Sequence, residues 1–372
     1  MRLEKRVHLK ENNTTVKTEI MAGVTSFMTM AYILAVNPNI LAAAGMDHGA
    51  VFTATAVASV IGTLCMALFA NYPFALAPGM GLNAYFAYTV VLGMGYSWEV
   101  ALAAVLTEGI IFIILSCFNI REAIFNAIPF NLKKAVSVGI GLFITFLGLQ
   151  NAKIVIGGAT LVGLFSVDGY NKTLADGLTA SMSDAGITVL LAIFGVLITG
   201  ILIVKNVKGN ILWGILITWI LGIICQFAGI YIPNPDLGFY NLLPDFSNGI
   251  SIPSLAPIMF KFSLKGVPVL EFIVIVFAFL FVDLFDTLGT LIGVSAKADM
   301  LDSEGRLPRI KGALLADAVG TTCGACLGTS TVTTFVESAS GVTEGGRTGL
   351  TSLTTGILFL LSLFLSPIFL AI

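Results

Sequence analysis

The stretch NYPFALAPGMGLNAYFAY, residues 71–88, decides the fold because it puts helix-disrupting residues inside an apolar segment. Proline blocks a backbone hydrogen bond of the helix, and glycine destabilises the helix interior. A second stretch, GTSTVTTFVESASGVTEGG at 328–346, starts with alternating Thr and Val and continues with a helix-like run that holds Glu337. Each stretch predicts a short strand followed by half a helix. The disrupting residues of the first stretch are Pro73, Pro78, Gly79 and Gly81.

The whole chain has the composition of an all-α protein that crosses a membrane many times. Of its 372 residues, 57% are hydrophobic and 11% are charged, and the mean hydropathy is +0.97. Soluble domains carry about twice that share of charged residues. Apolar runs of the length that a helix needs to cross a bilayer recur along the sequence. They predict about eleven spans, at 20–43, 51–70, 74–95, 98–118, 134–150, 185–204, 210–231, 268–296, 311–327, 329–344 and 349–370.

The distribution of positive charge predicts the orientation, because Lys and Arg resist transfer across the membrane. With the N-terminus in the cytoplasm, 15 of the 19 Lys and Arg residues fall on the cytoplasmic side. Residues 1–19 then form a polar cytoplasmic lead-in. The net charge of -2 gives no reason to expect a nucleic-acid partner. The four basic residues on the outer side are Lys153, Lys172, Lys261 and Lys265.

All five cysteines lie in or at the edges of predicted spans. Cys323 and Cys326 have C-x-x-C spacing, but one such pair supplies only two thiolates and no histidine is near. We therefore expect small packing residues, with no disulfide, no metal and no cofactor. The other three cysteines are Cys65, Cys117 and Cys225.

The two interrupted segments are the third and tenth spans, and this offset of seven predicts two seven-span repeats. Non-helical backbone at membrane depth is tolerated only where it is buried in protein or faces a cavity. Paired interruptions of this kind mark the binding site of a transporter. The alternative for the first segment is that Pro78 merely kinks a helix. A series of glycines at four-residue spacing predicts close helix packing, at Gly320, Gly324 and Gly328.

Two carboxylates lie inside the eighth span, in FVDLFDTLGT at 281–290. Asp283 and Asp286 share one helix face with Thr287 and Thr290. A charged Asp at the centre of a membrane helix costs about 2.5–3.5 kcal/mol, so this face must meet protein or water. Purely structural pairing would need a Lys or Arg inside a span, and the predicted span interiors contain none.

A buried carboxylate is stabilised by protonation as well as by a partner. Asp283, Asp286 and Glu337 are therefore candidates for proton carriers, for ligand acceptors, or for both.

The other acidic residues give weaker signals. Asp317, in LLADAVG, lies toward the cytoplasmic end of its span and is either a packing group or a support for the site. The remaining acids of interest lie at or near span ends and are expected at the interface or modestly buried. They are Glu99, Glu108 and Glu271.

Five motifs together resemble the AzgA-like adenine/guanine/hypoxanthine permeases, a branch of the nucleobase-ascorbate transporter superfamily of nucleobase:cation symporters. The resemblance runs over essentially the whole chain. The motifs are FMTMAYILAVNPNIL (27–41), FALAPGMGLNAYFAY (74–88), FVDLFDTLGTLIGVSAKADML (281–301), LLADAVGT (314–321) and GTSTVTTFVESASGVTEGGRTGL (328–350).

The resemblance implies fourteen spans in two inverted seven-span repeats, divided into a core domain and a gate domain. In this sequence, 20–118 would hold spans 1–4 of the core and 119–267 would hold spans 5–7 of the gate with their loops. Residues 268–372 would hold spans 8–11 of the core. Spans 12–14, the second half of the gate, would then be absent from the eleven predicted here.

The resemblance also implies import of purine bases with protons by an elevator-like movement, usually as a homodimer in the plasma (inner) membrane. The substrate residues carried over are Gly81, Asn83, Asp283, Asp286 and Glu337, together with the backbone near Val336. Asp283 is the first choice for touching the base. Four aromatic residues could cover a ring face of the base: Phe74, Tyr85, Phe86 and Phe335.

Two other functions fit parts of the sequence. An anion carrier of the same fold would need a cationic or neutral site, and three carboxylates argue against it. A membrane enzyme of the Mg²⁺-dependent prenyltransferase kind would use D-x-x-D motifs to hold the metal, which occur at 283–286 and 299–302. Such an enzyme would more naturally carry its motifs on separate helices, so we favour a transporter.

Overall fold

The fold is described from a computed structural model of the chain. Its described residues are 9–118, scattered positions from 129 to 150, 152–158, 161–165, 182–207, 209–233, 241–246, 251–302 and 307–371. The chain divides into two compact units. Unit 1 comprises residues 1–140 and 249–366, and unit 2 comprises 141–248 and 367–372. Both units are therefore built from segments that are far apart in the sequence.

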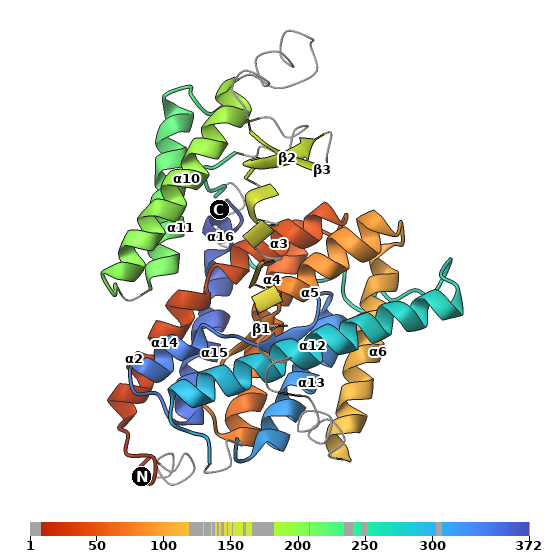
Figure 1. Cartoon of the computed structure of the whole chain (residues 1–372), viewed down its shortest axis with the longest axis vertical. Coiled ribbons are helices and arrows are strands. Elements are labelled where there is room, and N and C mark those ends of the chain that lie inside the picture. The colour runs from red at the N-terminus through yellow and green to blue at the C-terminus, as the bar shows by residue number, and fades with distance from the viewer. Residues whose placement is uncertain are drawn as a thin grey trace. The chain divides into compact units, whose positions relative to one another are not determined.

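Unit 1 is a helical bundle with one pair of short strands inside it (Figure 1). Helix α13 packs on α4 and α6, and α2 packs on α15. The described elements of unit 1 are α2 (Val16–Met30), α3 (Ile33–Ala43), α4 (His48–Cys65), η1 (Met66–Ala70), β1 (Leu76–Pro78), α5 (Met80–Ala84), η2 (Tyr85–Gly93), α6 (Trp98–Cys117), α12 (Val269–Lys297), α13 (Ile310–Leu327), β4 (Val332–Thr334), α14 (Ser338–Thr343), α15 (Gly349–Ser362) and η4 (Leu363–Leu365). A last short helix, α16 (Ser366–Phe369), follows in the sequence.

The first predicted span consists of two helices, α2 and α3, separated by a break at Ala31 and Tyr32. Just before the break, the Thr29 hydroxyl donates to the carbonyls of Thr25 and Ser26 at 3.2 and 2.9 Å. Hydroxyls that bond back to the preceding turn in this way often bend helices. The break places Tyr32 at the start of α3.

Helix α2 begins at Val16, before the predicted start at residue 20, and this brings Glu19 into the bundle. The Glu19 side chain is fully buried. Its carboxylate accepts from the amides of Arg347 (2.9 Å), Thr348 (3.2 Å) and Thr351 (3.2 Å). These amides lie at the N-terminus of α15, where they lack intrahelical partners and the helix dipole favours a negative charge. The last residues of the predicted 1–19 lead-in therefore belong to a packed helix.

The two interrupted segments meet in an antiparallel strand pair. β1 pairs with β4, with Leu76 opposite Thr334 and Pro78 opposite Val332. The Gly79 amide extends the ladder by donating to the Thr331 carbonyl at 2.9 Å. β1 is followed by α5, which continues as the π-helix η2, and β4 is followed by α14. Both segments thus contain a short strand and a helix, as the sequence predicts, and Pro78 ends a strand rather than kinking a helix.

Side chains of α4 and α13 satisfy the outer edges of this strand pair. The Thr63 hydroxyl accepts from the Leu76 amide at 2.9 Å and donates to the Leu76 carbonyl at 3.2 Å. On β4, Thr321 donates to the Val332 carbonyl at 2.9 Å, and Asp317 accepts from the last amide of the strand at 3.2 Å. A buried polar group left without a partner costs about 1–3 kcal/mol. These side chains therefore make the hydrogen bonds that neighbouring strands would make in a larger sheet.

Small residues let α13 approach the strand pair closely. A Cβ added to Gly320 would lie 3.0 Å from Val332 Cγ1 and 3.2 Å from Gly62 Cα. A Cβ on Gly324 would lie 2.9 Å from Val332 Cγ2. The close packing predicted for the glycine series is confirmed at these two positions. Gly328 has a different role, because its φ of +97° ends α13 in a left-handed conformation.

Helix α12 packs against both interrupted segments, since it contacts α5, β4 and α14. Buried apolar side chains form two clusters. Leu288 of α12 belongs to the same cluster as Leu76 and Val332 of the strands. Phe279, farther toward the start of α12, belongs to a second cluster with Leu82 of α5. The polar face of α12 therefore lies where the two segments cross.

Unit 2 contains the helices α10 (Met182–Val204) and α11 (Asn210–Phe227) and the hairpin of β2 (Val155–Gly158) with β3 (Leu161–Leu164) among its described residues. The two helices pack side by side (Figure 1). Gly195 and Gly214 face threonines of the partner helix at close range, which is typical of membrane helix pairs. Of the span predicted at 134–150, ten residues are described and all ten are helical, while the other seven lie outside the described residues.

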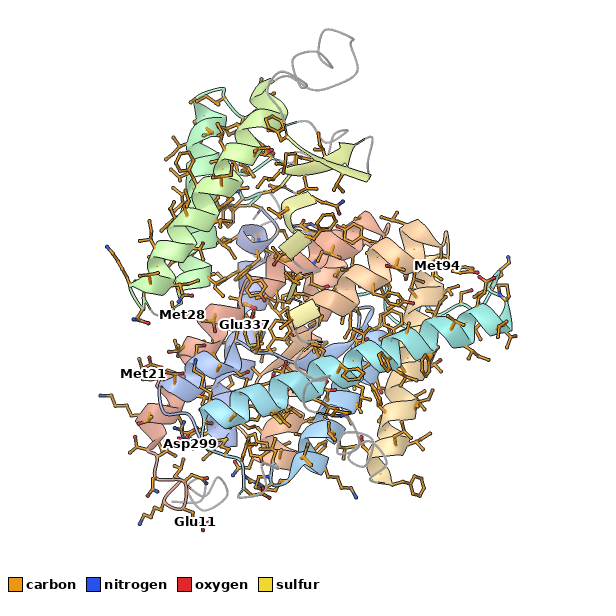
Figure 2. All side chains as sticks on the ribbon, in the orientation of Figure 1. Glu11, Met21, Met28, Met94, Asp299 and Glu337 are labelled. Atoms are coloured by element: carbon orange, nitrogen blue, oxygen red, sulfur yellow. The ribbon has the colours of Figure 1, made fainter. Side chains whose placement is uncertain are left out.

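Seven helical segments among the described residues are long and apolar enough to cross a membrane. Large apolar side chains cover much of the outer surface, and Figure 2 shows Met21 and Met28 on the outer side of α2. A surface of this kind fits contact with lipid. The seven segments are Val16–Ala43, His48–Ala70, Trp98–Cys117, Gly186–Val204, Asn210–Phe227, Ile310–Leu327 and Gly349–Phe369.

We expect Gly109→Ala to lower the thermal unfolding midpoint of the purified protein. The new Cβ would lie 2.5 Å from Thr322 Oγ1 and 2.9 Å from the Thr322 amide nitrogen, where α6 packs on α13. Overpacking of this kind costs about 1–3 kcal/mol. The matched control is Gly293→Ala on α12, where no atom lies within 4 Å of the new Cβ. Equal midpoints for the two variants would contradict the packing of α6 on α13.

Candidate functional site

Polar side chains from separate segments meet at the start of α5. Tyr32 comes from the break between α2 and α3, Asp286 from α12, and Glu337 from the residue before α14. A Cβ on Gly79 would lie 3.5 Å from Asp286 Oδ2. The Tyr32 hydroxyl donates to Glu337 Oε1 at 2.7 Å, and α12, which carries Asp286, packs on α14, which begins directly after Glu337. We call these four residues the carboxylate site.

Glu337 is held by the turn that leads into α14. It is half-buried, and Figure 2 shows it between the bundle helices. Its carbonyl accepts from the Ser340 hydroxyl at 2.5 Å, and the Thr29 hydroxyl oxygen lies 3.4 Å from the same carbonyl oxygen. These two hydroxyl oxygens are themselves 2.8 Å apart. The turn that carries Glu337 is thereby fixed to α2.

A second polar cluster lies deeper, beside the carboxylate site. Asp283 and Asp317 are both fully buried. Thr287 Oγ1 lies 3.1 Å from Asp283 Oδ1 and 2.9 Å from Asp317 Oδ2. It also lies 2.9 Å from Thr333 Oγ1. Because a hydroxyl donates one proton and accepts through its lone pairs, Thr287 links α12 to α13 and to β4.

The predicted substrate residues of the interrupted segments differ in exposure. Asn83 is fully buried, donates from Nδ2 to the Pro78 carbonyl at 3.4 Å, and accepts at Oδ1 from the Ser330 hydroxyl. It therefore ties the start of α5 to the segment before β4. Gly81 is half-buried on the first turn of α5. Val336, directly before the acidic residue of α14, has an exposed side chain.

The four predicted aromatic residues also differ. Phe74 is fully buried and its ring stacks on Tyr72, with centroids 5.2 Å apart. Phe86 is fully buried in the apolar cluster near α5. Phe335 is almost fully buried before α14. Tyr85 is half-buried, and its ring meets the edge of a phenylalanine of α12 at 4.8 Å.

The prediction that Glu108 lies near the interface is wrong. It is fully buried within α6 and accepts from the Thr331 hydroxyl at 2.8 Å. Its place near the middle of the predicted span 98–118 was the signal that could have revealed this.

Tyr32 was missed because a tyrosine in an apolar run carries no signal that it belongs to a site. Within the described residues, no group of three His, Cys, Asp or Glu side chains is arranged to hold a metal ion.

Helices long and apolar enough to cross a membrane, with carboxyl groups buried around a strand pair, fit a multi-pass membrane transporter. Residues 17–372 match the family model Xan_ur_permease, described as the Permease family. The chain belongs to this family of permeases. The resemblance seen in the motifs is thereby confirmed.

Relatives of known name cover nearly the whole chain. A permease-family protein of Methanocaldococcus jannaschii is 49% identical over 371 residues, which are 100% of this chain and 78% of the relative. The guanine/hypoxanthine permease PbuO of Bacillus subtilis is 43% identical, over 97% of this chain and 78% of its own length. The adenine permease AdeP of Escherichia coli is 40% identical, over 98% of this chain and 75% of its own length.

Solved structures share the fold at low sequence identity. The transmembrane domain of the cyanobacterial bicarbonate transporter BicA aligns with a TM-score of 0.62 at 15% identity, over 95% of this chain and 86% of that chain. SLC26A9 aligns with a TM-score of 0.55 at 10% identity, over 96% of this chain and 57% of that chain. This likeness concerns the fold alone.

We expect Thr287→Val to destabilise the protein, because it keeps the side-chain shape but removes the hydroxyl that Asp283 and Asp317 share. Losing a hydrogen bond to a charged group costs about 1.5–3 kcal/mol. The control is Thr107→Val on α6, whose hydroxyl donates to the Ala103 carbonyl of its own helix. Thermal unfolding of both variants tests this expectation, and it fails if T107V loses as much stability as T287V.

Proposed function

We propose that the chain imports purine nucleobases, and that Asp286 and Glu337 bind the base. The observation that carries this proposal is that α12 brings Asp286 to the start of α5 and packs on α14, at whose start Glu337 lies. The relatives named as guanine/hypoxanthine and adenine permeases support purines as the substrate class.

The chemistry of a purine edge suits this site. A purine presents N–H donors beside ring-nitrogen or carbonyl acceptors, and a carboxylate accepts through two oxygens. One oxygen of Glu337 accepts from Tyr32, and we assign the other, with Asp286, to the N–H groups of the base. The acceptors of the base then meet backbone amides near Gly81 and Val336. Amides at helix starts lack intrahelical partners.

The packing distinguishes the two aspartates of α12. The sequence favours Asp283 for contact with the base, but Asp283 is fully buried and engaged by Thr287. Asp286 is less buried and lies next to Gly79. We therefore assign base contact to Asp286 and assign Asp283 to the support of the site. Asn83, through its bonds to Pro78 and Ser330, belongs to the same support.

Among the aromatic residues, Tyr85 is the best candidate for covering a ring face of the base. It is half-buried and follows the first turn of α5 directly. Phe335, next to the exposed Val336, is the second candidate. The rings of Phe74 and Phe86 are enclosed by other side chains and are less suited to this role.

The same carboxyl groups support a proposal of proton symport. A neutral base carries no charge that the membrane potential could drive, whereas a co-transported proton does. Carboxyl groups buried at membrane depth can bind and release that proton. We propose Asp286 and Glu337 as the coupling groups, with Asp283 as the third candidate.

The transport cycle we propose is an elevator movement of a core against a gate. The chain divides into unit 1, which contains β1 and β4, and unit 2, which contains α10 and α11. This division supports a core role for unit 1 and a gate role for unit 2. Two inverted seven-span repeats would explain why β1 and β4 run antiparallel. In this proposal, homodimers lie in the plasma (inner) membrane with the N-terminus in the cytoplasm.

An anion carrier of the same fold is the second candidate. The likeness to the bicarbonate transporter BicA concerns the fold alone, at 15% identity. Carboxylates beside the strand pair repel an anion unless a cation is bound with it. Purine import is therefore the better supported function.

We expect the protein in proteoliposomes to take up radiolabelled guanine, hypoxanthine or adenine when an inward proton gradient is imposed. A protonophore should abolish the accumulation. Bicarbonate should not compete with the purine. Accumulation that persists with the protonophore would refute proton symport, and competition by bicarbonate but by no purine would favour the anion carrier.

We expect Asp286→Asn and Glu337→Gln to reduce purine binding at least about tenfold each, since a charge-assisted hydrogen bond contributes about 1.5–3 kcal/mol. Asp283→Asn should mainly lower the unfolding midpoint while binding is retained in the folded fraction. Equilibrium binding of labelled purine to purified protein, corrected for folded protein, measures both effects. Loss of binding in D283N alone would reverse the assignment of the two aspartates.

A further inference from the structure

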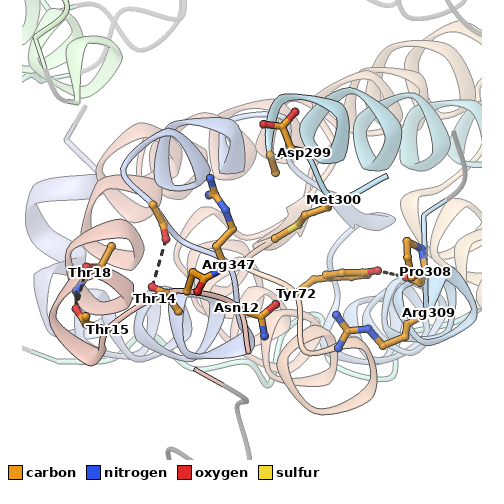
Figure 3. Close-up of a pocket in the computed structure, with 13 residues that line it drawn as sticks. Asn12, Thr14, Thr15, Thr18, Tyr72, Asp299, Met300, Pro308, Arg309 and Arg347 are labelled. Carbon is orange, nitrogen blue, oxygen red and sulfur yellow. Dashed lines mark hydrogen bonds between the residues drawn. The ribbon is translucent and has the colours of Figure 1, made fainter. Parts of the chain in front are cut away.

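A cavity of about 640 Å³ lies in unit 1 and shares no lining residue with the carboxylate site. Its wall is built from segments distant in the sequence (Figure 3). The lining residues are Asn12, Asn13, Thr14, Thr15 and Thr18 around the start of α2, Tyr72 before β1, Ala298, Asp299 and Met300 after α12, Pro308 and Arg309 before α13, and Gly345 and Arg347 between α14 and α15.

Two arginines line the cavity from different parts of its wall. The guanidinium of Arg347 donates from Nη1 to the carbonyls of Val342 and Gly346 at 2.7 and 2.8 Å. Arg309 lies over the ring of Tyr72, with its Cζ 4.7 Å from the ring centroid (Figure 3). A guanidinium has five N–H donors in a fixed planar arrangement. Both side chains are therefore oriented by contacts that engage only part of each guanidinium's hydrogen-bonding capacity.

The wall segments are joined to one another. The Thr14 hydroxyl donates to the Gly345 carbonyl at 3.4 Å, which connects the N-terminal segment to the loop that carries Arg347 (Figure 3). The Tyr72 hydroxyl donates to the Pro308 carbonyl, which connects the loop before β1 to the start of α13. The segments of the wall are thus held together by hydrogen bonds.

The electrostatics of the wall favour an anion. α2, with 15 residues, and α13, with 18, begin at the wall and place the positive ends of two helix dipoles there, while α12, which ends at the wall, places one negative end there. Among the described lining residues, the charged ones are Arg309, Arg347 and Asp299. Asp299 lies at the C-terminal end of α12 and offsets one of the two positive charges.

The cavity also borders an apolar surface. On the first turns of α2, Val16, Ile20 and Met21 are exposed, on the same helix as the lining residue Thr18. A polar cavity at the start of a helix that also exposes apolar side chains suits a phospholipid, whose charged headgroup adjoins its acyl chains.

The geometry points to a binding site for a phosphate group in this cavity, carried by the headgroup of an anionic phospholipid or by a soluble phosphate compound. Arginine forms bidentate hydrogen bonds with phosphate oxygens. The threonine hydroxyls and Asn12 offer further donors along the wall. Asp299 then accepts from a hydroxyl of the ligand. Binding joins the start of α2 to the segments around α13 and α15, and therefore stabilises unit 1.

The test uses the whole purified chain and compares two phosphate sources. In one arm, the unfolding midpoint in detergent is measured with inorganic phosphate and with chloride at equal ionic strength. In the other arm, the protein in nanodiscs of phosphatidylcholine, with and without phosphatidylglycerol, is examined by native mass spectrometry for retained lipid. The variants are Arg309→Gln and Arg347→Gln. Lys311→Gln is the matched control, because Lys311 lies on α13 close to the cavity but does not line it.

We expect selective retention of phosphatidylglycerol, a midpoint raised by phosphate, or both, with about tenfold weaker binding in each arginine variant and unchanged binding in K311Q. A response to phosphate alone would identify a soluble ligand, and a response to phosphatidylglycerol alone would identify the lipid. No response in either arm would overturn the proposal. So would a response that survives in R309Q and R347Q, or one that K311Q reduces equally.

Discussion

The fold of unit 1 depends on one constraint, which is that a two-stranded sheet lies inside a bundle of membrane helices. Each strand has three residues, and every strand residue is buried. A strand pair leaves one edge of each strand without a backbone partner, and at membrane depth no water replaces it. The polar groups that satisfy these edges therefore have to come from side chains of the surrounding helices.

That constraint explains why α4 and α13 carry polar residues toward the centre of the bundle. Thr63 serves the edge of β1, while Thr321 and Asp317 serve the edge of β4. Asp317 has a second role, because its other oxygen lies within hydrogen-bonding distance of Thr287. The residue that completes the sheet thus also holds the polar face of α12. Sheet and site are one hydrogen-bonded structure, and a change in either is expected to disturb the other.

The sequence indicated the interrupted segments and the acidic residues of the site because both break a strong apolar pattern. Proline and glycine in a span, or aspartate in a helix of Phe, Leu and Val, can be recognised without knowing any neighbour. Glu19 and Glu108 were misjudged for the opposite reason. Each is buried because of a partner from elsewhere in the chain, the start of α15 for Glu19 and Thr331 for Glu108. Such partners follow from helix packing, which local pattern does not determine.

Tyr32 illustrates the same limit at the site itself. Its hydroxyl reaches Glu337 across 305 residues of sequence, and it can do so only because the chain breaks between α2 and α3. The motif around Tyr32 contains no proline or glycine at that break. The hydroxyls of Thr25 and Thr29, which bond to the preceding turn, are the local feature that accompanies it. A pair of threonines one turn apart is a weak signal, because it also occurs in straight helices.

The two aspartates of α12 show how one helix face can serve two purposes. Residues three apart on a helix differ by about 60° in direction, whereas residues four apart differ by about 40°. Asp283 and Thr287 are four apart and point together toward α13 and β4, where Asp317 and Thr333 meet them. Asp286 is turned away from that direction and lies near Gly79 at the start of α5. The three-residue spacing therefore places Asp283 among the residues that support the strand pair and Asp286 at the carboxylate site.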